Sequence, residues 1–178
     1  MFNQINLDKV MKIALFSILR LSNLRFAVTA LGLSLFSLAA SAQSAAPVLM
    51  AYYGVKDALV ATDANKARMQ AITLSSALTK LNAAKLSTTD KKALATAQTH
   101  AVAIGKTTAV DTQREQFAML STSMITLAKA TKPAKAYVQF CPMAADGKGA
   151  SWLSDKKEVR NPYYGDKMLK CGSVKEEI

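Results

Sequence analysis

The two cysteines of this chain lie near its carboxyl terminus, and each has a methionine close by on the side facing the other cysteine. The sequence reads C-P-M from Cys141 to Met143 and M-L-K-C from Met168 to Cys171. Thiolate and thioether sulfurs are soft ligands that select Cu(I) or Ag(I) over hard cations. Four sulfurs brought together by a folded loop would therefore suit a soft metal ion.

The spacing within each pair allows both sulfurs to point the same way. Cys141 and Met143 are two residues apart, so in an extended segment their side chains lie on one side. Met168 and Cys171 are three residues apart, which suits a helical turn. Zinc fits less well, because its usual ligands are cysteine, histidine and carboxylate. The single histidine, His100, belongs to a predicted helix and is expected at the edge of the core.

The same two cysteines could instead form a disulfide. Paired cysteines outside the cytoplasm usually oxidise. A bond between Cys141 and Cys171 would close a loop of about 30 residues and add roughly 3–4 kcal/mol of stability. Met143 and Met168 would then be core residues flanking the bond. The residues leave both interpretations open.

The start of the chain has the features of a secretory signal. Basic residues precede an apolar run over residues 26–40, and the A-S-A sequence ending at Ala42 matches a cleavage site. We expect cleavage after Ala42 and a mature protein of residues 43–178 in the periplasm or outside the cell, without stable membrane insertion. Because the charged region is long, Met11 is an alternative start codon.

The composition of the expected mature chain excludes several classes of function. It carries 19 basic and 11 acidic residues, a net charge of +8, and the basic residues are scattered along it. A nucleic-acid-binding protein would more often cluster them and interleave aromatic residues. The sequence has no Ser-His-Asp arrangement and no phosphate-binding glycine loop, so an enzyme is not expected. The length fits a single domain.

The middle of the chain is predicted to be helical. Residues 48–132 are rich in alanine, leucine, lysine, glutamine and threonine and poor in glycine and proline, which favours helices over strands. Short links between the helices predict an all-α fold, an up-and-down four-helix bundle. Asp63 and Ser87 are expected to cap two of the helices. The expected helices cover about residues 47–61, 63–84, 87–105 and 111–132.

Several side chains of the predicted helices have expected places. The spacing of Met69, Met119 and Met124 suits core filling, the usual role of methionine in a helix interface. Arg114 and Glu115 lie in the first turn of the fourth helix. We expect them to form a surface pair rather than to connect that helix to the tail.

From about residue 134 the composition changes to glycine, proline, asparagine and aromatic residues. Residues 137–140 are predicted to form a short extended segment, and Asp146-Gly147 and Asn161-Pro162 mark turns. Large aromatic side chains in an irregular region are expected to pack it against the helices. These are Trp152, Tyr163 and Tyr164.

The tail and the fourth helix resemble a bacterial family called domain of unknown function 3347. The matching runs are C-P-M-A-A-D-G-K-G-A-S-W-L-S-D-K-K-E-V-R-N-P-Y-Y-G-D-K-M-L-K-C-G and D-T-Q-R-E-Q-F, the latter starting at Asp111. The resemblance covers about residues 48–178 and includes all four sulfur residues. It implies a small exported protein, or a domain linked to the periplasmic adaptor of a heavy-metal efflux pump, with that adaptor as partner.

Together these observations favour an exported binding protein without enzymatic activity. It would hold or hand over Cu(I) or Ag(I) through Cys141, Met143, Met168 and Cys171. The alternative is a disulfide-stabilised helical interaction module that binds no metal.

Overall fold

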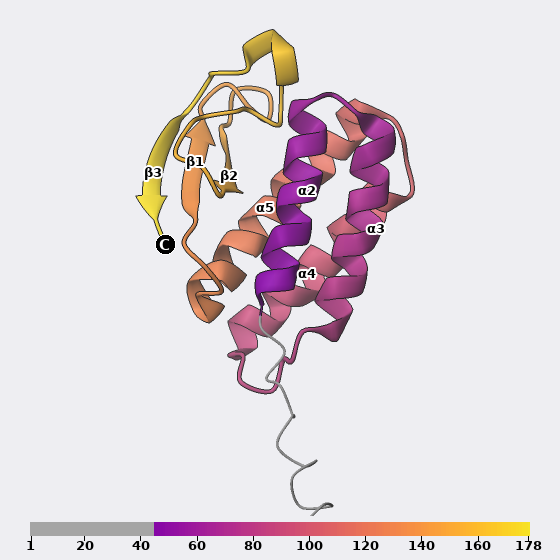
Figure 1. The fold of residues 1–178 in the computed structure, drawn as a ribbon, viewed down its shortest axis with the longest axis vertical. Helices are drawn as coiled ribbons and strands as arrows, with labels where there is room; N and C mark the ends of the chain where they lie inside the picture. Colours follow the sequence, from indigo (N-terminus) through magenta and orange to yellow (C-terminus); the bar gives the residue numbers. More distant parts are fainter. Residues whose placement is uncertain (1–44) are drawn as a thin grey trace, which may run out of the picture. The chain divides into compact units, whose positions relative to one another are not determined.

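The computed structural model describes residues 45–178. The predicted signal segment and its cleavage site lie outside the described residues. Within the described residues, four α-helices come first, and a small sheet follows (Figure 1). The helices are α2 (Ala46–Val60), α3 (Ala64–Lys80), α4 (Thr88–Gly105) and α5 (Val110–Thr131).

Two helices begin at the predicted capping residues. The carboxylate of Asp63 accepts a hydrogen bond from the backbone N–H of Lys66 at 2.9 Å, at the start of α3. The hydroxyl oxygen of Ser87 accepts one from the N–H of Asp90 at 3.2 Å, at the start of α4. Both bonds satisfy N–H groups that the helix itself leaves without a partner. The prediction of four helices is confirmed.

Helix α3 is shorter than the sequence predicts, because it ends at Lys80 rather than near Ala84. Leu81 has an extended backbone. The side-chain oxygen of Asn82 then accepts a hydrogen bond from the N–H of Ala84 at 2.9 Å. This local bond gives the backbone an alternative to the next helical turn.

Each helix packs against the next one along the chain. The packed face of α3 carries Ala71 and Leu74, which are fully buried. Met124 on α5 is buried as predicted, but Met69 and Met119 are exposed. The core prediction for these two methionines is wrong. At 3.6 residues per turn, Met69 lies about 200° round the helix from Ala71, on the side facing solvent.

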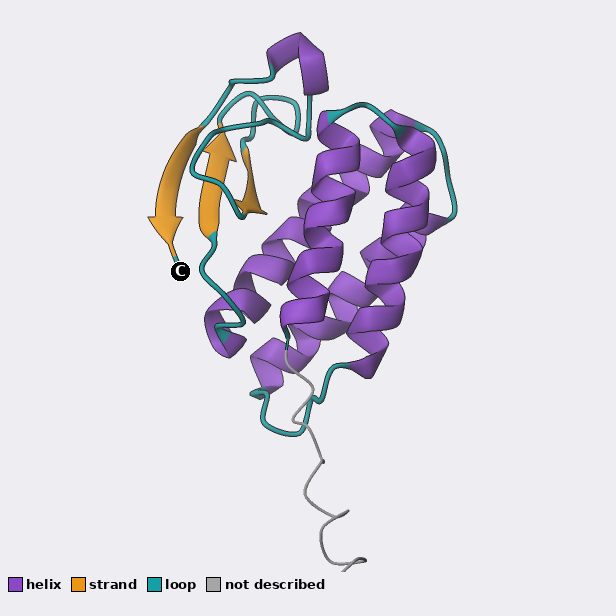
Figure 2. Ribbon diagram, viewed as in Figure 1, coloured by secondary structure: helices purple, strands orange, loops and turns teal. Residues whose placement is uncertain are grey.

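The C-terminal region contains a three-stranded antiparallel sheet, so the chain is mostly helical rather than all-α (Figure 2). The predicted extended segment is confirmed as the central strand, and the strand order is β2-β1-β3. A short 3₁₀ helix, η1 (Gly165–Met168), precedes the last strand. The strands are β1 (Tyr137–Cys141), β2 (Ala150–Ser154) and β3 (Ser173–Glu177).

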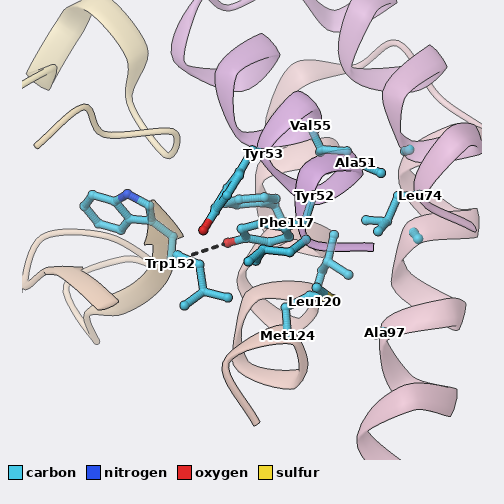
Figure 3. Close-up of a cluster of buried hydrophobic side chains, with 14 of the residues drawn as sticks. Ala51, Tyr52, Tyr53, Val55, Leu74, Ala97, Phe117, Leu120, Met124 and Trp152 are labelled. Atoms are coloured by element: carbon cyan, nitrogen blue, oxygen red, sulfur yellow. Dashed lines mark hydrogen bonds between the residues drawn. The ribbon is translucent and has the colours of Figure 1, made fainter. Parts of the chain in front are cut away.

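A buried tyrosine of α2 connects the sheet to the helices (Figure 3). The hydroxyl of Tyr52 lies 2.7 Å from the hydroxyl of Ser121 on α5. The same Tyr52 oxygen accepts a hydrogen bond from the backbone N–H of Leu153 on β2 at 3.1 Å. One side chain therefore satisfies polar groups on a second helix and on a strand.

Aromatic rings continue this connection into the tail. The ring of Tyr52 stacks on that of Phe117, with centroids 5.3 Å apart. Tyr163 packs against Phe117 at 5.7 Å and against the edge of Trp152 at 5.8 Å. Trp152 and Tyr163 are buried, and Tyr164 is half-buried. The predicted packing of the aromatic tail on the helices is confirmed.

Burial raises the pKa of three tyrosines, which predicts a loss of stability in alkali. Desolvation is the main cause for Tyr52, Tyr53 and Tyr163, and the charge of Asp155 adds to it for Tyr53. Above about pH 10 the unfolded chain releases these protons while the native state keeps them. Because the native state then binds more protons, the free energy of unfolding falls as pH rises.

Urea unfolding at a series of pH values, with tyrosinate absorbance recorded on the same samples, checks this expectation. The three phenols should ionise only as the protein unfolds. Complete tyrosine ionisation in the folded protein near the pH of the urea-unfolded control would contradict it.

Candidate functional site

The two cysteines meet as the sequence arguments require, and they form a disulfide. Cys141 ends β1 and is fully buried, whereas Cys171 lies between η1 and β3 and is half-buried. Their Cα atoms are 5.7 Å apart, within the usual range for a disulfide. Of the two interpretations left open by the sequence, the structure contains the disulfide, and in this state neither sulfur is a free thiolate.

The two methionines lie close in the chain to the bonded cysteines, Met143 in a turn and Met168 at the end of η1. Met143 follows Cys141 in a turn in which the N–H of Ala144 donates to the carbonyl of Cys141. The carbonyl of Met168 accepts a hydrogen bond from the N–H of Cys171 at 3.0 Å. Met143 is 52% exposed and Met168 is 37% exposed. Their expected place in the core beside a disulfide is therefore wrong, because both reach solvent.

An asparagine that the sequence marked only as a turn residue positions the second cysteine. Asn161 is fully buried, and its side-chain N–H donates to the carbonyl of Cys171 at 3.0 Å. Its side-chain oxygen accepts from the N–H of Tyr163 at 2.8 Å, and its own N–H donates to the carbonyl of Leu169 at 2.8 Å. One residue thus connects the cysteine segment to the aromatic segment.

A buried glutamine of β1 holds the loop that follows β2. The side-chain N–H₂ of Gln139 lies within hydrogen-bond distance of three successive carbonyls, those of residues 156, 157 and 158. Gln139 faces Trp152 across the β1–β2 pair and is fully buried. Nothing in the sequence marks this residue as functional, because an isolated glutamine in a strand is usually on the solvent face.

Arg114 connects α5 to the tail, contrary to the expectation of a surface pair with Glu115. Its guanidinium donates to the carbonyls of Pro162 at 3.1 Å and Leu59 at 3.3 Å, and to the hydroxyl of Thr62 at 3.1 Å. Burial lowers its pKa, and Asp111, 3.7 Å away, opposes that shift. Because its main partners are backbone oxygens far along the chain, the predicted surface pair is wrong for Arg114.

An open pocket of about 440 Å³ lies beside this arginine, between α5 and the tail. Its walls combine exposed methionine, phenol rings and both signs of charge. The pocket is lined by Asp111, Arg114, Glu115, Ala118, Met119, Ala145, Asp146, Lys148, Tyr163 and Tyr164.

His100 does not line this pocket. It lies on α4 with its Nδ1 2.7 Å from the side-chain oxygen of Gln116.

A comparison with known families decides the identity of the helical part. Residues 48–136 match the model of the family described as protein of unknown function DUF3347. The chain belongs to this family. No curated protein and no solved structure matches the chain.

The matched DUF3347 segment covers α2 from Val48 onward and the whole of α3, α4 and α5, and it ends just before β1. The four sulfur residues lie beyond it, so the metal role of Cys141, Met143, Met168 and Cys171 stays a prediction. In the described part of this DUF3347 protein, no three histidine, cysteine or acidic side chains gather to hold a metal ion. Among residues 45–178, no helix is long and apolar enough to cross a membrane.

Proposed function

We propose that the protein is an exported, non-enzymatic interaction module whose C-terminal sheet is fixed by the Cys141–Cys171 disulfide. The disulfide is the observation that carries the proposal, because it removes both thiols from metal binding. Cys141 is fully buried in the bonded state. The signal-like sequence ending at Ala42 motivates the export, and an oxidising compartment is where such a bond persists.

We also propose that the four helices follow one another up and down in an antiparallel bundle. The segments between them are short, with residues 61–63 joining α2 to α3 and residues 106–109 joining α4 to α5. Short connections favour antiparallel neighbours. Such an arrangement offers long exposed helix faces, whereas the aromatic rings of the tail are occupied in packing.

A second candidate function is soft-metal binding by the reduced protein. The exposure of Met143 and Met168 beside the cysteines favours it, because a purely structural disulfide does not require methionines that face solvent. The oxidised form suits Cu(I) or Ag(I) less well, since it offers two thioethers and no thiolate. Reduction would restore two thiolates of the kind that soft ions select. A heavy-metal efflux adaptor would be the partner in this case.

Titration of both redox forms with Ag(I) tests the two candidates. The interaction-module proposal predicts that the oxidised protein takes up no stoichiometric Ag(I) and keeps its fold. The metal proposal predicts one Ag(I) per reduced chain and a large loss of affinity in Cys141→Ser/Met168→Leu. Met50→Leu/Met69→Leu, which changes two exposed methionines elsewhere, is the matched control. One tightly bound Ag(I) per oxidised chain would contradict the first proposal, and unchanged affinity in the cysteine–methionine variant would contradict the second.

A further inference from the structure

An open apolar groove runs between the first half of α2 and the second half of α3, which lie side by side in Figure 1. Its volume is about 530 Å³. The sheet contacts α5, so the groove is on a part of the molecule that the C-terminal strands do not cover. The lining residues are Pro47, Val48, Ala51, Ile72, Thr73, Ser76, Ala77, Lys80 and Leu81.

Small side chains explain why the groove is hollow. Ala51 on α2 and Ser76 and Ala77 on α3 line it, and none of them is large enough to fill the space between the helices. Farther along, the side chain of Gln70 on α3 reaches across to Gly54 on α2, where a Cβ atom would come within 2.5 Å of its oxygen. The Gln70 side chain therefore occupies the space between the helices beyond the groove.

Three large apolar side chains on these two helices face solvent. Met50 on α2 is 67% exposed, and Met69 and Ile72 on α3 are 61% and 52% exposed. Ile72 also lines the groove. A surface with exposed apolar side chains beside an apolar groove binds a partner more often than ordinary protein surface does. Methionine is common on such surfaces because its flexible thioether adapts to different partners.

Among the residues that line the groove, the charged one, Lys80, is basic. Helix α3 carries Lys66, Arg68 and Lys80 and no acidic residue. The ion pairs found within residues 45–178 include none of these three cations. Lys66 and Lys80 are separated by 14 positions of one helix, which is about 21 Å at 1.5 Å per residue. They lie on the solvent-facing side of α3, at its two ends.

We propose that the α2–α3 groove binds an acidic amphipathic helix of a partner protein, a proposal that rests on the interaction-module function. The apolar face of that helix, with side chains at i, i+3, i+4 and i+7, fills the groove. Its carboxylates pair with Lys80 in the groove lining and with Lys66 at the other end of α3. A concave surface with small residues on its floor suits a convex helix rather than a flat lipid surface. The exposed methionines close over the sides of the bound helix.

A synthetic helical peptide tests the proposal, with the protein produced from the full-length chain. The probe has leucine at helical spacing on one face and glutamate on the other. Its controls are a scrambled sequence of the same composition and a version with lysine in place of glutamate. Calorimetry should show saturable binding of the probe and at least tenfold weaker binding of both controls. Equal binding of all three peptides, or no binding of the probe, would overturn the proposal.

Paired variants locate the contact. Lys66→Glu/Lys80→Glu should weaken probe binding about 2- to 30-fold, the range for losing two exposed ion pairs. Lys91→Glu/Lys92→Glu changes the net charge equally at exposed sites on α4 and should leave binding unchanged. Ser76→Phe, at an exposed position, should fill the groove and abolish binding with the fold intact. Equal losses from both lysine pairs would overturn the groove assignment.

Two further measurements distinguish a partner helix from a membrane or a second copy of the chain as the occupant of the groove. In sedimentation with vesicles containing phosphatidylglycerol, the wild type and Ser76→Phe should behave alike, because the groove does not bind lipid. In sedimentation velocity the two proteins should also have the same oligomeric state, because the groove does not bind a second copy. A difference between the two proteins in either measurement would assign the groove to a membrane or to a second copy and overturn the proposal. Because the groove is distant in sequence from the cysteines, counting thiols on the same sample distinguishes failure of the groove from failure of the disulfide-linked module.

Discussion

Replacing Trp152 with alanine is expected to lower the free energy of unfolding by about 3–5 kcal/mol. The indole is fully buried, faces Gln139 across the strand pair and packs its edge on Tyr163. Alanine would leave a cavity within the C-terminal region, beside Tyr163 and Gly172, and packed surroundings fill such a cavity only partly. Urea unfolding followed by circular dichroism measures the loss.

Two further variants serve as controls for Trp152→Ala. Trp152→Phe should cost less, because it keeps a ring and removes an indole N–H that is buried without a hydrogen-bond partner in the described residues. Met50→Ala, at an exposed position, should change the free energy of unfolding by less than about 0.5 kcal/mol. A loss below about 1 kcal/mol in Trp152→Ala would show that the indole is not packed in solution as it is in this structure.

Removing the disulfide is expected to have the second large effect. Cys141→Ala/Cys171→Ala should lower the free energy of unfolding by roughly 3–4 kcal/mol, because the unfolded chain regains the freedom of a loop of about 30 residues. Alanine is preferred to serine because the Cys141 site is fully buried, and a serine there would have a hydroxyl without a partner. The measurement is urea unfolding without reductant.

Reduction of the wild-type protein is the matched control for this variant. The reduced wild type and the double alanine variant should lose similar stability and release the same segment, η1 and β3. Hydrogen exchange should then increase in residues 165–177 while α2 to α5 stay protected. Equal stability of the oxidised and reduced wild type would contradict a structural role for the bond.

The helices could be predicted because their signals are local. Capping oxygens at Asp63 and Ser87 and the lack of glycine and proline between them define α3 within a few residues. The missed end of α3 depends on a turn at Asn82, whose side chain bonds two residues ahead. Such a turn competes with a helix through a small energy difference that spacing patterns do not reveal.

The sheet could be predicted only in part because its outer strands lack local signals. β2 reads A-S-W-L-S and β3 reads S-V-K-E-E, and neither alternates apolar with polar residues over a useful length. Both are fixed by pairing with β1, and β3 is also fixed by the bond to Cys171 just before it. The residues of either strand alone do not predict long-range pairing of this kind.

Some features of the candidate site could be predicted from the sequence, and others could not. The convergence of Cys141 and Cys171 could be predicted from their mirrored sequence context. The role of Arg114 could not, because it binds carbonyls 48 and 55 residues away, which any residue type supplies. The exposure of Met69, on the groove helix, also escaped prediction because methionine spacing alone does not identify the buried side of a helix rich in alanine.

The most direct test of the account is a thiol count on protein taken from the cell envelope without reductant. The sample is alkylated in denaturant, and its intact mass is measured. We predict no alkylated cysteine, a mass two hydrogens below that of the reduced chain, and a sequence beginning at residue 43. Two alkylated cysteines in the freshly isolated protein would contradict the disulfide-linked module.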